Sequence, residues 1–111
     1  MTAHAELAAG RWRTLTLCQQ LGNIGSEVSR AVKWKGRNPG LSDSAVVRAL
    51  ELLDLTIADP RWSGRLKELL RAREVLCDAW LGGALYGSSL GAMDRYFYPF
   101  AASARSRPAA T

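Results

Sequence analysis

Apolar residues recur in steps of three and four along four separate stretches of the chain. The first of these lines consists of Leu17, Leu21, Ile24, Val28 and Ala31. Such spacing places apolar side chains on one face of an α-helix and polar side chains on the other. No stretch alternates apolar and polar residues for long enough to predict a β-strand. The pattern therefore predicts an all-α protein.

The first predicted helix begins at about residue 17 and ends before the glycine- and proline-containing stretch 36–40. Thr16 and Gln19 have the spacing of a capping box, in which each side chain bonds to the backbone N–H of the other residue. Gly22 and Gly25 lie inside this helix, and each lowers helix propensity by up to about 1 kcal/mol relative to alanine. Because the apolar line continues past both glycines, we expect them to allow close approach of a neighbouring helix.

Two further helices are predicted on either side of Asp59. The second helix is expected to begin at Ser42 or Ser44, where a serine hydroxyl can cap the first turn. The third is expected to run from about Pro60 to Leu81, because Asp59 suits an N-cap and proline suits the first helical position.

The fourth predicted helix spans about Leu90–Ala104, and Ser88 or Ser89 caps its start. Pro99 lies inside this stretch. Proline removes one backbone hydrogen bond of a helix, so we expect either a kink or an earlier helix end.

These helices predict one domain. Short loops join them in succession, which favours an antiparallel up-down four-helix bundle over residues 16–105. We expect residues 1–15 to form a flexible lead-in and residues 106–111 to form a disordered tail.

The composition narrows the choice of partners. The chain of 111 residues has a formal net charge of +5, which favours a polyanionic partner, nucleic acid first and an acidic protein second. No apolar run approaches the ~20 residues that a membrane span needs, and the N-terminus lacks the pattern of a secretory signal. We therefore expect a cytoplasmic protein that does not enter a membrane.

The up-down order gathers basic residues at one end of the bundle, where the first helix begins and the fourth ends. We call this set the first pole: Arg11, Arg13, Arg61, Arg65, Lys67, Arg105 and Arg107. The second pole, at the opposite end, contains Lys33, Lys35 and Arg37. We expect the first pole to bind the phosphates of nucleic acid.

Tryptophans accompany both poles, with Trp12 and Trp62 at the first and Trp34 and Trp80 at the second. Basic residues for phosphates and aromatic rings for stacking are typical of a nucleic-acid surface. The alternative is that the tryptophans close the ends of the bundle and the arginines are only solvated, because tryptophan is usually mostly buried.

Glu27, Arg30 and Arg73 lie on or beside the apolar lines of the first and third helices. A charge in such a position must be paired or must face a partner. Glu27 and Arg30 are one turn apart, and we expect Arg73 to reach Glu27 across the helix interface. The three residues then form either a buried salt bridge that sets helix register or a polar patch at a subunit interface or ligand site.

The chain contains no combination of residues that indicates catalysis or a cofactor. Its only histidine is His4, and no Ser/His/Asp set, phosphate loop or paired His/Glu metal motif is present. A helical-bundle ribonuclease would need an arginine followed closely by histidine, which is also absent. We therefore expect a protein that is not an enzyme and that needs no metal.

Four segments of the chain resemble a group of small bacterial proteins: IGSEVSRAVKWK (24–35), RALELLDLTIADPRW (48–62), RLKELLRAREVLCD (65–78) and YFYPFAASAR (96–105). In broad shape that group is similar to the four-helix-bundle proteins of the rRNA intervening-sequence type and to the accessory variability proteins of diversity-generating retroelements. The latter are basic homo-oligomers that bind a reverse transcriptase and nucleic acid. No functional residue carries over by motif.

The resemblance implies a non-catalytic, homo-oligomeric accessory bundle that binds RNA or DNA and serves a reverse transcriptase. The alternative is a protein-interaction bundle, antitoxin-like or a scaffold, whose basic surface meets an acidic protein.

Overall fold

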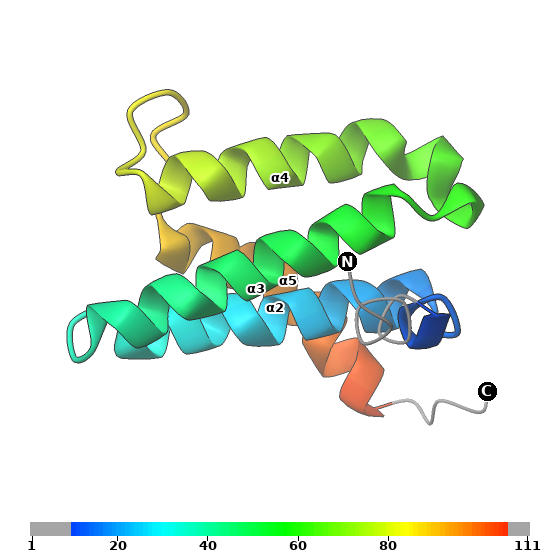
Figure 1. The fold of residues 1–111 in the computed structure, drawn as a ribbon, viewed down its shortest axis with the longest axis horizontal. Helices are drawn as coiled ribbons and strands as arrows, with labels where there is room; N and C mark the ends of the chain where they lie inside the picture. The colour runs from blue at the N-terminus through cyan, green and yellow to red at the C-terminus, as the bar shows by residue number, and fades with distance from the viewer. Residues whose placement is uncertain (1–9, 107–111) are drawn as a thin grey trace.

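The computed structural model describes residues 10–106, with side chains up to Ser103. It consists of α2 (Leu17–Trp34), α3 (Pro39–Ile57), the short 3-10 helix η1 (Pro60–Arg65), α4 (Leu66–Trp80) and α5 (Leu90–Ser106) (Figure 1). No strand occurs within these residues, so the all-α prediction is confirmed. The expectations for residues 1–9 and 107–111 lie outside the described part of the chain.

The helices form an antiparallel up-down bundle, as predicted. Figure 1 shows the chain crossing the molecule and reversing at each connection, with α2 and α3 side by side and α5 behind them. α2 packs most extensively, against α5 on one side and α3 on the other, whereas α4 makes smaller contacts with α3 and α5. The helix Leu17–Trp34 is therefore the centre of the bundle.

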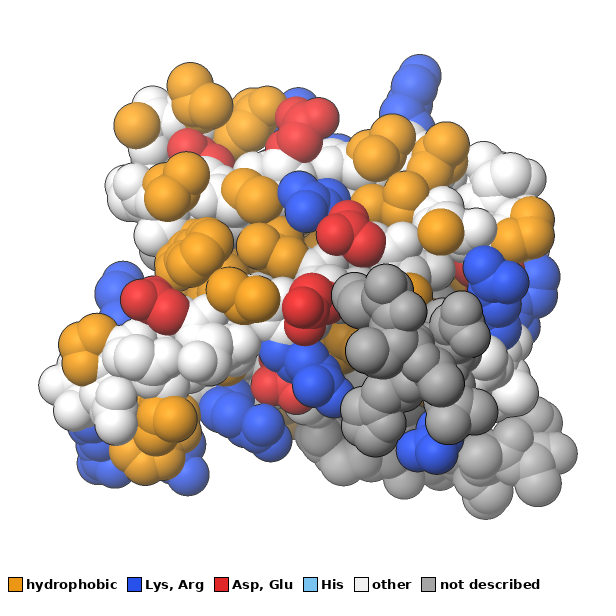
Figure 2. Space-filling view, viewed as in Figure 1, with side chains coloured by type: hydrophobic (Ala, Val, Ile, Leu, Met, Phe, Trp, Pro, Cys, Tyr) orange, Lys and Arg blue, Asp and Glu red, His pale blue; other side chains and the backbone are white. Residues whose placement is uncertain are grey.

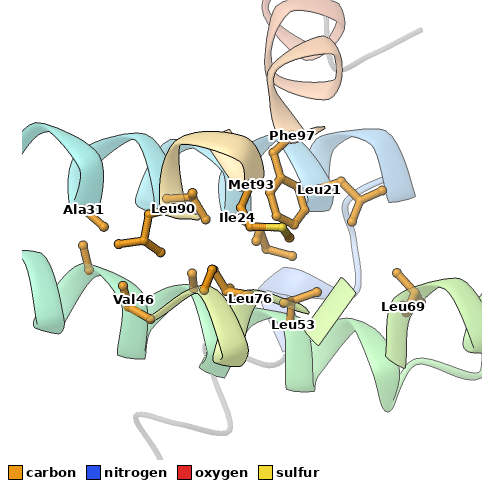
Figure 3. Packing of buried hydrophobic residues seen from close by; sticks show 14 of the residues in the cluster. Leu21, Ile24, Ala31, Val46, Leu53, Leu69, Leu76, Leu90, Met93 and Phe97 are labelled. Carbon is orange, nitrogen blue, oxygen red and sulfur yellow. The ribbon is translucent and has the colours of Figure 1, made fainter. Parts of the chain in front are cut away.

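The core is built from the predicted apolar lines. Ile24, Val28, Leu53, Leu76 and Phe97 are all fully buried and come from the four long helices (Figure 3). Burying a side chain of this size stabilises the folded state by about 1.5–3 kcal/mol. These side chains hold the four helices to one another and fix which helix faces remain outside.

Gly25 lets α5 approach α2 closely, as the sequence predicts. A Cβ atom placed at Gly25 would lie 2.7 Å from the Cβ atom of Phe97. Real Cβ atoms do not come this close, so any larger residue at this position would push the two helices apart. The most extensive helix pair in the molecule thus depends on a glycine.

The capping box at the start of α2 is confirmed. The Thr16 hydroxyl accepts from the Gln19 N–H at 3.1 Å, and the Gln19 side chain accepts from the Thr16 N–H at 2.9 Å. The predicted start of the second helix is wrong by about one turn. Asn38 caps α3 by accepting from the Leu41 N–H at 3.2 Å, and proline occupies the first helical position. Ser42 is already inside the helix.

The predicted third helix is wrong in its first part. Asp59 and Pro60 cap and begin a helix as expected, but that helix is η1, and α4 begins only at Leu66. The backbone leaves helical geometry at Trp62, with φ −105° and ψ 20°. Gly64 weakens the helix here, and Arg61 and Trp62 bind groups in and just before α2. Tertiary contacts therefore override the helical pattern.

The predicted fourth helix is confirmed in its start and extends slightly further than expected. The Ser89 hydroxyl accepts from the Ala92 N–H at 3.1 Å, and α5 continues through Pro99 to Ser106. Its ribbon changes direction along the helix (Figures 1 and 3), in keeping with the kink expected from an internal proline.

Candidate nucleic-acid interface

The structure brings together the elements of the first pole. The start of α2 and η1 lie at the same end of the molecule (Figure 1). The side chain of Arg105 and all of Arg107 lie outside the described part of the chain. The described basic residues of the first pole are all exposed: Arg11, Arg13, Arg61, Arg65 and Lys67.

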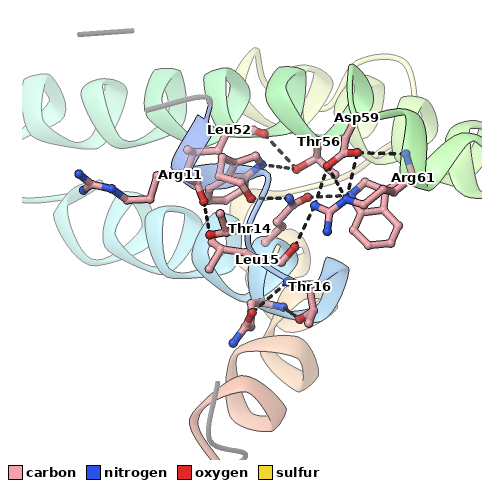
Figure 4. Close-up of polar contacts among 12 residues, drawn as sticks. Arg11, Thr14, Leu15, Thr16, Leu52, Thr56, Asp59 and Arg61 are labelled. Atoms are coloured by element: carbon pink, nitrogen blue, oxygen red, sulfur yellow. Dashed lines mark hydrogen bonds and ion pairs between the residues drawn. The ribbon is translucent and has the colours of Figure 1, made fainter. Parts of the chain in front are cut away.

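Arg61 is occupied by contacts within the protein. One of its Nη atoms lies 2.7 Å from Asp59 Oδ2, and the same nitrogen donates to the Leu15 carbonyl at 3.0 Å (Figure 4). Hydrogen bonds from Arg61 lower the pKa of the buried Asp59 carboxyl, and the Asp59 carboxylate raises the pKa of Arg61. The guanidinium also lies over the Trp62 ring, 4.4 Å from its centroid. Arg61 therefore ties η1 to the segment before α2.

Trp12 and Trp62 close the first pole through a continuous chain of hydrogen bonds. The Trp12 indole N–H donates to the Thr56 hydroxyl at 2.9 Å, and the Gln20 amide donates to the Trp12 carbonyl at 2.9 Å. The Trp62 indole N–H donates to the Gln20 side-chain oxygen at 3.0 Å. Trp12 is only 7% exposed. Trp12 therefore packs in the core and the half-buried Trp62 packs against that core, as the alternative expects of the tryptophans. Its other part, arginines that are only solvated, does not hold for Arg61.

Arg65 is also paired, whereas three other cations of the first pole are not. The Arg65 Nε donates to Glu68 at 2.8 Å, and the Glu68 carboxylate accepts from the Tyr96 hydroxyl at 3.3 Å. Burial, with the Glu68 charge second, raises the pKa of Tyr96. Within residues 10–106, no ion pair involves Arg11, Arg13 or Lys67. The first pole therefore offers fewer available cations than its sequence indicates.

The predicted network of Glu27, Arg30 and Arg73 is only half correct. Arg30 pairs with Glu27 at 3.3 Å, as expected. Arg73 does not reach Glu27; its Nε donates to Asp54 of α3 at 2.7 Å, and this carboxylate raises the pKa of Arg73. The prediction failed because Asp54 lies on the face of α3 that meets α4. The Arg73 and Asp54 side chains are 37% and 56% exposed, so the pair is not buried.

The second pole contains a denser group of unpaired cations. Lys33, Lys35 and Arg37 are exposed at the turn between α2 and α3, and none of them has an ion pair among the described residues. The sequence contains no acidic residue between Glu27 and Asp43. Figure 2 shows basic and hydrophobic side chains next to one another over this turn, at the lower left. The turn therefore presents concentrated positive charge to solvent.

Backbone hydrogen bonds hold this turn in a defined shape. The N–H groups of Arg37 and Asn38 both donate to the Trp34 carbonyl, at 2.9 and 2.8 Å. The Lys33 ammonium lies 5.8 Å from the centroid of the Trp34 ring. Basic side chains and an indole ring thus lie within a few residues of one another at the end of α2.

A surface groove of about 610 Å³ extends along α2 and α3 from the second pole. Its apolar surface includes Trp34, Leu41 and Val47, and the two aliphatic side chains are 46% and 43% exposed. The remaining lining residues are Glu27, Arg30, Asp43, Ser44, Ala45, Arg48 and Glu51. Such a volume falls in the range of ligand-binding sites.

Neither a metal site nor a membrane helix occurs in the described part of the chain. Residues 10–106 include no group of three His, Cys, Asp or Glu side chains that could hold a metal ion. None of the helices in this range combines the length and apolar content that crossing a membrane requires. His4 lies outside the described residues.

Comparisons with known protein families, curated proteins and solved structures find no match to this chain. Of the resemblance drawn from the sequence, the structure supports the general architecture alone, a small all-helical domain with four main helices.

Proposed function

We propose that this bundle is a non-catalytic accessory protein that binds the phosphate backbone of RNA or DNA, chiefly through the second pole. The observation that supports this most strongly is the turn between α2 and α3, where Lys33, Lys35 and Arg37 are exposed and have no acidic partner among the described residues. Phosphate contacts of this kind release counterions and give salt-dependent affinity. Arg11, Arg13 and Lys67 of the first pole supply further, weaker contacts.

The resemblance adds two finer proposals, a reverse transcriptase as the protein served and assembly into a homo-oligomer. Leu66 and Leu70 are 38% and 43% exposed on α4 and offer an apolar surface for protein contacts. Mass measurement of the native protein tests the assembly, and a monomer would remove the analogy with the oligomeric retroelement proteins. Co-purification with a reverse transcriptase encoded nearby tests the partner.

The binding proposal is tested by titrating salt against affinity with two triple variants of equal charge. One is Lys33→Gln/Lys35→Gln/Arg37→Gln, and the matched control is Arg11→Gln/Arg13→Gln/Lys67→Gln. Each removes three positive charges from a net charge of +5. Fluorescence anisotropy of a labelled single strand and of its duplex gives the dissociation constants.

We expect the second-pole variant to lower the slope of log K against log salt by about 2 to 3 units. The control should change the slope less. Equal losses in both variants would mean that net charge alone governs binding, and a larger loss in the control would move the site to the first pole. If neither nucleic acid binds at low salt but polyglutamate does, the protein-interaction function replaces this proposal.

A further inference from the structure

The groove beside the second pole contains charges of both signs, whereas the turn contains only positive charges. Its lining contains three carboxylates, from Glu27, Asp43 and Glu51, and two guanidinium groups, from Arg30 and Arg48. Glu27 already neutralises Arg30 at 3.3 Å. A phosphate placed inside the groove would therefore meet acidic oxygens, whereas a phosphate on the turn would meet only cations.

A nucleobase suits the groove where a phosphate does not. The Trp34 ring and the exposed Leu41 and Val47 side chains provide an apolar surface for a flat ring. Aromatic side chains stack on bases of any sequence, since every base has a π face. Carboxylates accept hydrogen bonds from exocyclic amino groups, such as N4 of cytosine, and Glu51 and the exposed Ser44 hydroxyl lie in the same lining.

The groove and the basic turn are formed by neighbouring residues of the sequence. Trp34 lies between Lys33 and Lys35 and lines the groove, while the basic side chains on either side of it are exposed at the turn. A nucleotide whose base enters the groove could thus keep its phosphate on the turn. A base can take this position only if it is not paired, because duplex bases are stacked and covered.

From this arrangement we infer that the α2–α3 groove is a base-binding site for single-stranded nucleic acid, in which one base stacks on Trp34 while the adjoining phosphates contact Lys33, Lys35 and Arg37. The inference rests on the proposed function and adds a preference for single strands over duplexes. The acidic lining also disfavours an acidic polypeptide as the occupant of the groove.

The test compares single-strand and duplex affinity in two variants of one residue. Trp34→Leu keeps apolar volume but removes the aromatic ring, and Trp34→Phe keeps a ring. Tyr98→Leu is the matched control, because it removes an aromatic ring that is 61% exposed and does not line the groove. Labelled mixed-sequence DNA of 12 nucleotides, alone and annealed to its complement, is the probe.

We expect Trp34→Leu to weaken single-strand binding by about fivefold or more and to leave duplex binding and the salt slope unchanged. Trp34→Phe and Tyr98→Leu should bind the single strand nearly as tightly as the wild type. Equal affinity of Trp34→Leu and the wild type for the single strand would overturn the inference, as would equal losses for single strand and duplex.

Intrinsic fluorescence provides a second measurement that does not depend on the folding of Trp34→Leu. The single strand should quench part of the wild-type tryptophan fluorescence, and this quenching should be absent in Trp34→Phe although the variant still binds. Quenching that persists in Trp34→Phe would contradict stacking on Trp34. The proposed function fails separately, when neither the single strand nor the duplex binds at low salt.

Discussion

At the end of the bundle where α2 begins, Arg61 lies against Asp59 and the Leu15 carbonyl, and Arg65 lies against Glu68. At the opposite end, Lys33 in the last turn of α2 and Lys35 and Arg37 in the turn after it have no acidic partner among the described residues. The first pole has more basic residues in the sequence, but the second has the denser group of available charges. Counting basic residues therefore locates a binding surface less well than asking which of them are already paired.

The geometry of the arginine side chain helps to explain why Arg61 is occupied. The planar guanidinium of Arg61 donates to both Asp59 carboxylate oxygens and to the Leu15 carbonyl at the same time. Lysine is a compact charge on a flexible stem and makes fewer such fixed contacts. Arg61 of the first pole thus joins two segments of the chain, whereas the three cations of the second pole are exposed.

The largest expected effect is a loss of stability at the first pole without a loss of nucleic-acid binding. Trp12→Ala should lower the free energy of unfolding by about 3–5 kcal/mol, because it empties a core position and removes the indole N–H that donates to the Thr56 hydroxyl. Urea denaturation measures this loss. Nucleic-acid affinity per folded molecule should not change, and a parallel loss of affinity would show that the two ends are not independent.

Asp59→Ala should have a smaller effect at the same end. It removes the cap of η1 and the partner of Arg61, which should lower the free energy of unfolding by about 0.5–2 kcal/mol. Glu51→Ala removes the same charge from an exposed position and should change stability by no more than about 0.5 kcal/mol. Similar losses for both variants would contradict the structural role of Asp59.

Acid should weaken this contact in the wild type. Because hydrogen bonds from Arg61 lower the pKa of folded Asp59 below 3.8, the carboxylate stabilises the folded state fully above that value. The contribution is lost as the pH falls from about 4 through the folded pKa. Urea denaturation between pH 2 and pH 7 should show a shallower acid decline for Asp59→Asn than for the wild type. Identical declines would rule out this linkage.

The Arg73–Asp54 pair should contribute less, since both partners are more than one-third exposed. A double-mutant cycle of Arg73→Gln with Asp54→Asn should give a coupling energy of about 0.2–1 kcal/mol that decreases with salt. The matched cycle of Arg73→Gln with Glu27→Gln should give no coupling. Coupling in the second cycle would restore the pairing that the sequence predicts.

The smallest expected effect is on stability at the second pole. Replacing Lys33, Lys35 and Arg37 with glutamine should change the free energy of unfolding by no more than about 0.5 kcal/mol, because these exposed side chains have no ion pairs among the described residues. Thermal and urea denaturation measure this directly. A large destabilisation would show that the turn stabilises the fold instead of remaining available for a ligand.

Local interactions explain which features could be predicted from the sequence. The capping box of Thr16 and Gln19 involves residues three positions apart, so its geometry follows from the sequence spacing. The same holds for the Asp59 cap and for the Glu27–Arg30 pair. The start of α3 differs from the prediction because Asn38 lies in the stretch 36–40 that ends the preceding helix and also caps the next one.

Long-range partners explain the remaining errors. Asp54 and Arg73 are 19 positions apart, and many carboxylates were equally plausible partners before the helices were packed. Trp12 and Thr56 are 44 positions apart, and neither residue type indicates the other. The break at Trp62 likewise accompanies contacts to Gln20 and the Leu15 carbonyl, which no local pattern contains.

The sequence by itself determined the all-α class, the order of the helices and the extent of Leu17–Trp34, because apolar periodicity and caps act within a few residues. Only the tertiary structure decided which cations are paired, which tryptophans are sealed and where a groove opens beside Trp34. Ion pairs and burial depend on side chains that meet only after the helices pack. The number of residues between two side chains along the chain does not determine how far apart they lie in the folded protein.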